Sequence, residues 1–139
     1  MSVIADFYVS AADHAIVYDN PDEQATFLRA RHNGITPLEV STLWAAINGR
    51  AWDVAIMEEF ECVLERDRGE RLIHQLPHDF LTDLVAVPVR EHVALLAAWA
   101  RTDELRCDPA DLKPLFSDLL GLCEAALDTG KNVYMWNSL

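Results

Sequence analysis

The chain has 139 residues, of which 51% are apolar and 24% are charged. This balance is typical of a globular domain and argues against a disordered segment, which would combine low hydrophobicity with high charge. The 23 acidic residues outnumber the 11 basic ones, so the formal net charge is -12. Such a charge argues against nucleic acid or an anionic membrane surface as a partner.

The acidic excess lies towards the two ends of the chain. Residues 1–28 contain five carboxylates and no lysine or arginine, whereas residues 29–101 hold 11 acidic and 8 basic residues. Residues 102–139 hold 7 acidic and 3 basic residues. An excess of this kind either keeps a protein soluble or attracts a basic partner.

The cysteines and the hydropathy predict a cytoplasmic protein with reduced thiols. Cys62, Cys107 and Cys123 include no Cys-x-x-Cys pair, which argues against a zinc ribbon or a thioredoxin-type site. Cys62 and Cys123 lie in apolar sequence, where a free thiol packs as a small hydrophobe. The first residues lack the pattern of a signal peptide, and no apolar run approaches the roughly 18 residues of a membrane span.

The first third of the chain predicts two strands around a short helix. Residues 3–9 are rich in β-branched and aromatic side chains and predict a strand. Ser10 and Asp13 fit a capping box for a helix that ends near Asn20-Pro21. Residues 25–31 predict a second strand, which Asn33-Gly34 closes.

A helix beginning at Thr36 is the clearest local prediction. Thr36 is an N-cap, Pro37 occupies the first helical position and Glu39 completes a capping box. Asn48-Gly49 ends the helix. Its apolar residues recur at helical spacing: Val40, Leu43, Trp44 and Ile47. A further short turn of helix is expected over residues 51–58.

The middle of the chain predicts a hairpin followed by two helices. Phe60, Cys62 and Leu64 alternate with polar neighbours, and the hairpin turns through residues 67–69, where a glycine supplies positive φ. Pro77 and Pro88 each open a helix. The second helix is expected to bury one stripe, with Trp99 beside it: Val89, Val93, Leu96 and Ala100.

The last third predicts a long helix and a closing strand. Asp108 and Pro109 repeat the start signal seen at Thr36, and Gly130 is placed to end the helix in the left-handed conformation. The buried face is marked by Leu112, Leu115, Phe116, Leu119, Leu122, Cys123 and Ala126. Residues 132–137 have strand composition.

These elements predict a single α+β domain over residues 1–139. Its small sheet, mixed or antiparallel, includes the N- and C-terminal strands and the hairpin over residues 60–75, and about four to six helices pack on it. If the terminal strands pair and the first helix folds back, four aromatic residues cluster: Tyr8, Tyr18, Tyr134 and Trp136.

The histidines and carboxylates form no recognised catalytic or metal-binding motif. His74 and His78 are separated by Pro77, and no glutamate follows the first histidine as a zincin requires. The other histidines lie in separate predicted elements: His14, His32 and His92. Carboxylates around the hairpin turn alternate with arginines, which indicates local neutralisation. The five scattered glycines build no phosphate-binding loop, so neither metal nor cofactor is predicted.

The favoured hypothesis is a non-catalytic protein–protein interaction module whose acidic surface attracts a basic partner. In size and charge only, this is the way that bacterial immunity proteins and antitoxins work. The candidate interaction surface is acidic throughout: Asp6, Asp13, Asp19, Asp22, Glu23, Glu58, Glu59 and Glu61.

Two alternatives stay open. An enzyme or a small-molecule-binding protein would build its site from scattered carboxylates, histidines and tryptophans. It would hold at least two titratable groups of perturbed pKa in one partly apolar pocket. A homodimer is compatible with the same sequence features.

Overall fold

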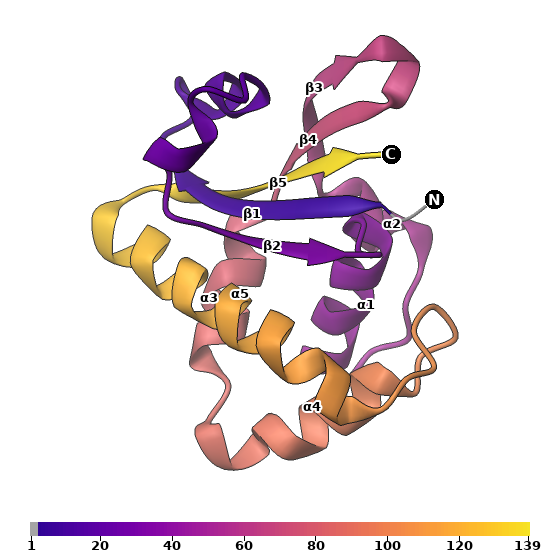
Figure 1. Ribbon diagram of the computed structural model, residues 1–139. Coiled ribbons are helices and arrows are strands. Elements are labelled where there is room, and N and C mark those ends of the chain that lie inside the picture. The colour runs from indigo at the N-terminus through magenta and orange to yellow at the C-terminus, as the bar shows by residue number, and fades with distance from the viewer. Residues whose placement is uncertain (1–2) are drawn as a thin grey trace.

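The computed structural model describes residues 3–139, and within this range five antiparallel strands form one sheet in the order β2-β1-β5-β4-β3 (Figure 1). The strands are β1 (Ile4–Ser10), β2 (Arg29–Asn33), β3 (Glu61–Arg66), β4 (Arg71–Gln75) and β5 (Asn132–Ser138). β1 and β5 pair along their whole length, so the two ends of the chain lie side by side. The predicted α+β fold, with both terminal strands and the central hairpin in one sheet, is confirmed.

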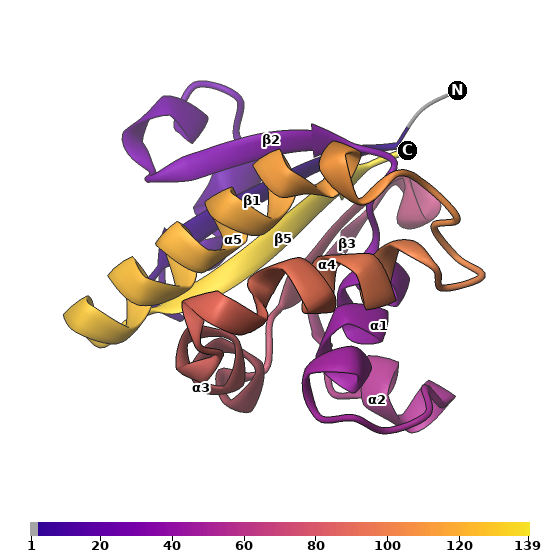
Figure 2. The ribbon, with the colours of Figure 1, turned by 90° about the horizontal axis from the view of Figure 1, so that it is seen from below.

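Five α-helices within residues 3–139 cover one face of this sheet or border it (Figure 2). They are α1 (Pro37–Ile47), α2 (Val54–Glu58), α3 (His78–Ala86), α4 (His92–Ala100) and α5 (Pro109–Thr129). α5 contacts β1, β2 and β5, while α3 and α4 pack against α5 and against α1. None of these helices combines the length and the apolar character that crossing a bilayer requires.

The main core lies between the sheet and the helices. Alternate residues of the central strands point into it, among them Phe7 of β1 and Met135 of β5. All seven apolar residues predicted for the buried face of α5 are buried, and Gly130 ends that helix at φ 66°. The capping box at the start of α1 is formed as predicted. Trp99 packs beneath it and donates from Nε1 to the Glu39 carbonyl at 3.0 Å.

The opposite face of the sheet carries a second, aromatic cluster. An outer segment, residues 11–28, runs over this face and contains two short 3-10 helices, Ala15–Asp19 and Gln24–Thr26. Tyr18 of this segment stacks on Tyr8 with ring centroids 4.0 Å apart. Tyr134 and Trp136 of β5 complete the cluster. Both faces of the sheet are therefore covered.

Two carboxylates tie the outer segment to the sheet. Asp6 is fully buried on β1, where it accepts hydrogen bonds from Arg31 Nε at 2.7 Å and from the Tyr18 hydroxyl at 2.5 Å. Burial, followed by this bond to Asp6, raises the pKa of Tyr18 to about 12, so the hydroxyl stays a donor at neutral pH.

Asp19 makes the second tie, from the outer segment to β4 and β5. Its carboxylate accepts from Arg71 Nε at 2.9 Å and from Trp136 Nε1 at 3.0 Å, and Arg66 Nε lies 3.0 Å away. Burial by itself would raise the pKa of Asp19, but the bonds from Arg71 and Trp136 outweigh it and lower the pKa.

The structure corrects the predictions for the first third of the chain. Ser10 caps no helix; its hydroxyl donates to the Ala11 carbonyl, and the segment after it forms 3-10 turns instead. The second strand begins at Arg29 and not at Ala25, because Gln24–Thr26 forms a 3-10 turn before the chain joins the sheet edge.

Two predicted faces are also wrong. A bulge between Cys62 and Leu64 breaks the alternation of β3, so Cys62 is exposed while Leu64 packs on the aromatic cluster. Of the stripe predicted after Pro88, Leu96 and Ala100 are buried, but Val89 and Val93 are 80% and 76% exposed. Val89 belongs to the 3-10 turn Val89–Glu91 and Val93 to the first turn of α4, whereas the buried residues of α4 begin at Leu95.

The buried carboxylate predicts a coupling between Asp6 and Arg31. Arg31→Met would leave the buried Asp6 carboxylate without its hydrogen bonds from the guanidinium. We therefore expect urea denaturation to show that the free energy of unfolding falls by about 1–3 kcal/mol. In an Asp6→Asn background, which carries no buried charge, the same substitution should cost clearly less. Arg106→Met, which removes an exposed pair with Asp103, is the control and should change stability little. Additive losses at Asp6 and Arg31 would contradict the coupling.

Candidate functional site

The eight carboxylates predicted from the sequence do not form one surface. Asp6 and Asp19 are held in the internal contacts described above and face the aromatic cluster. Asp13 and Asp22 are exposed on the outer segment, and Glu23 is partly exposed there. The remaining three are exposed at the end of α2 and the start of β3: Glu58, Glu59 and Glu61. The acidic residues thus divide between internal contacts and two separate exposed regions.

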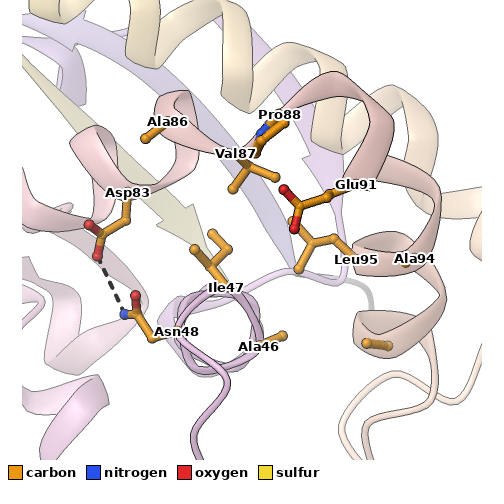
Figure 3. Close-up of a pocket in the computed structure, with 11 residues that line it drawn as sticks. Ala46, Ile47, Asn48, Asp83, Ala86, Val87, Pro88, Glu91, Ala94 and Leu95 are labelled. Atoms are coloured by element: carbon orange, nitrogen blue, oxygen red, sulfur yellow. Dashed lines mark hydrogen bonds between the residues drawn. The ribbon is translucent and has the colours of Figure 1, made fainter.

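The candidate site is a groove among the ends of three helices, α1, α3 and α4 (Figure 3). This α1–α3–α4 groove encloses about 480 Å³. In Figure 3 the side chains of Ile47, Val87 and Leu95 point toward one another between Asp83 and Glu91. Its eleven lining residues are mostly apolar: Ala46, Ile47, Asn48, Asp83, Ala86, Val87, Pro88, Glu91, Ala94, Leu95 and Ala98.

Local sequence explains why the helices leave this space open. α3 stops at Ala86 because Val87, which precedes Pro88, takes an extended conformation (ψ 122°). α4 lines the groove with Leu95 and with two small residues, Ala94 and Ala98. The methyl side chains of these alanines do not fill the gap to α1. The groove is therefore built by a proline-terminated helix and by small residues on its neighbour.

Two carboxylates border the apolar floor. Asp83 Oδ2 accepts from Trp44 Nε1 at 2.9 Å and from Asn48 Nδ2 at 3.4 Å, which fixes the carboxylate at the end of α1. Glu91 is exposed on the α4 side. Among residues 3–139, neither Asp83 nor Glu91 forms an ion pair. The border thus carries negative charge without a cationic partner.

A smaller pocket of about 370 Å³ adjoins the groove and shares Asn48 and Asp83 with it. We call it the Trp44 pocket. Its other lining residues are Trp44, Arg50, Glu59 and Asp79. The Arg50 guanidinium carbon lies 5.8 Å from the centroid of the Trp44 ring, within the range of a cation–π contact.

The histidines do not converge on one site. His14 and His74 line two different pockets, the first between the outer segment and the end of α5, the second beside Pro37. His32 contacts Asp118 of α5, and His92 packs edge-on against Phe116. Within residues 3–139, no group of three or more His, Cys, Asp or Glu side chains is arranged to hold a metal ion.

The groove was not predicted because none of its residues belongs to a catalytic or binding motif; Asn48 and Pro88 indicated only where helices end and begin. Asp83 and Glu91 lie in ordinary helical sequence, and only packing brings them to the two sides of one cavity. A weak signal was present: Ala94 and Ala98 are four apart, so they place two small residues on one side of a helix.

Comparisons with protein-family models, with curated proteins and with solved structures found no match to this chain. A function for the groove must therefore be argued from its geometry and charge.

His74 generates a prediction for stability against pH. Burial lowers its pKa below the ordinary 6.5, and its buried Nδ1 has no hydrogen-bond partner among residues 3–139. Below pH 6.5 the His74 imidazole is therefore protonated in the unfolded chain while it stays neutral in the folded protein. The free energy of unfolding should fall as the pH drops towards the folded-state pKa. Thermal unfolding of His74→Leu should lose this part of the pH dependence. The exposed control His78→Gln should keep it, and an unchanged pH profile in His74→Leu would contradict the assignment.

Proposed function

We propose that the protein is a non-catalytic binding module for a basic protein partner, and that the α1–α3–α4 groove receives that partner. The observation that carries the proposal is the pairing of an apolar floor with two carboxylates on its border, Asp83 and Glu91, that form no ion pair within residues 3–139. An apolar side chain of the partner would fill the floor, and basic residues beside it would meet the border.

The difference between carboxylates in internal ion pairs and carboxylates at the groove supports this location. Asp6 and Asp19 are engaged by arginines within the fold, so they contribute little attraction for a partner. Asp83 and Glu91 line the groove, and within residues 3–139 neither forms an ion pair with an arginine. Complementary charge mainly raises the association rate and selects the partner, while apolar burial supplies the affinity.

The test uses a defined probe, a helical peptide of leucine and lysine about four turns long. In an NMR titration of the labelled protein, we expect the amides of Ile47, Val87 and Leu95 to shift and the affinity to fall as salt rises. The double variant Asp83→Asn, Glu91→Gln should bind about fivefold more weakly, since two partly exposed charge contacts contribute about 1 kcal/mol together.

The matched control is Glu124→Gln, Asp128→Asn, which removes two exposed charges from α5. It changes the net charge by the same amount and lies outside the groove. Unchanged binding in this control supports the proposal. Equal weakening in both double variants, or shifts confined to residues outside the groove, would contradict it.

A further inference from the structure

The Trp44 pocket offers an aromatic ring that is held in a fixed orientation. Trp44 Nε1 donates to Asp83, and the ring meets Phe60 and Phe80 edge-on at centroid distances of 6.3 and 6.2 Å. A ring fixed in this way is preorganised for a cation over one face, so little ordering cost is added on binding.

The chain's own guanidinium already occupies that face. Arg50 is exposed, yet its guanidinium carbon lies 5.8 Å from the ring centroid and Trp44 is only 4% exposed. Within residues 3–139, Arg50 makes no ion pair within 4.0 Å. Its backbone is fixed, because its amide donates to the Ala45 carbonyl at 3.1 Å. The guanidinium of Arg50 therefore lies within cation–π range of the Trp44 ring without being anchored by an ion pair to a described carboxylate.

The charges around this arginine exceed what it can neutralise. Glu59, Asp79 and Asp83 all line the same pocket, so three carboxylates share it with one guanidinium. Asp83 also belongs to the border of the α1–α3–α4 groove, and Asn48 lines both cavities. A partner seated in the groove would therefore have a cation-binding pocket directly beside it.

We infer that the Trp44 pocket is a subsite for an arginine side chain of the partner, and that Arg50 occupies it when the partner is absent. This inference rests on the proposed function, because the arginine is one residue of the partner that the groove receives. The planar guanidinium suits the subsite better than an ammonium, since it stacks on an aromatic face and binds carboxylates in a bidentate manner. Arg50 must leave the ring or share the pocket, so it competes with the incoming side chain.

The test uses N-acetyl-arginine methylamide and N-acetyl-lysine methylamide as probes, with the indole N–H resonance of Trp44 as the readout. We expect the arginine probe to shift this resonance in a saturable way and the lysine probe to bind more weakly. Arg50→Gln should bind the arginine probe roughly three- to fivefold more tightly, because it removes the internal competitor. Glu59→Gln, Asp79→Asn should weaken the binding.

A net-charge effect is separated by Arg90→Gln, which removes one exposed positive charge outside the Trp44 pocket. Tightening in Arg50→Gln but not in Arg90→Gln supports displacement of Arg50. Equal tightening in both variants, or an indole resonance that the arginine probe leaves unmoved in Arg50→Gln, would overturn the inference.

The two proposals fail in different ways. If the leucine–lysine peptide binds the groove while the arginine probe leaves Trp44 unmoved, the subsite is wrong and the binding module stands. If the arginine probe binds at Trp44 while the peptide does not bind the groove, the subsite stands as a guanidinium-binding pocket and the proposed function fails.

Discussion

The buried carboxylate of Asp6 is the constraint on which the arrangement of this protein depends. A charge on the central strand β1 requires hydrogen-bonding partners, and the antiparallel register supplies one by placing Arg31 of β2 directly opposite. The Tyr18 hydroxyl supplies another, and it does so only if the outer segment crosses the sheet. The outer segment that covers Asp6 thus also covers Tyr8, Tyr134 and Trp136, so the sheet has apolar packing on both faces.

The same constraint divides the acidic residues by role. Carboxylates that face the aromatic cluster form ion pairs with arginines from neighbouring strands. They therefore contribute to the stability of the fold rather than to the electrostatic field outside the protein. Asp83 and Glu91 form no ion pair within residues 3–139, and they border an apolar cavity among α1, α3 and α4. A net charge of -12 is therefore not one uniform surface. The proposed binding of a basic partner depends on this local arrangement and not on the total charge.

Features specified by neighbouring residues could be predicted from the sequence. The Thr36 capping box, the turn through Asp67 and Gly69 and the buried face of α5 all formed as expected, because each depends on contacts within a few residues. Among features that depend on distant contacts, the sheet that includes both terminal strands was predicted, but the site and its internal ion pairs were not. The role of Asp6 follows from its register with Arg31, and the groove follows from how three helices end beside one another. The exposure of Val89 and Val93 was not predicted either, because their spacing matches that of the buried Leu96 and Ala100 while the core begins only at Leu95.

Amide hydrogen exchange, followed by NMR, tests most directly whether the two groups of carboxylates have these different roles. In Asp6→Asn, Asp19→Asn the account predicts faster exchange across residues 11–28 and in β2, with α5 still protected. In Asp83→Asn, Glu91→Gln it predicts exchange rates close to those of the unchanged protein throughout. Uniform loss of protection in both variants, or an outer segment that stays fully protected without Asp6 and Asp19, would contradict the account.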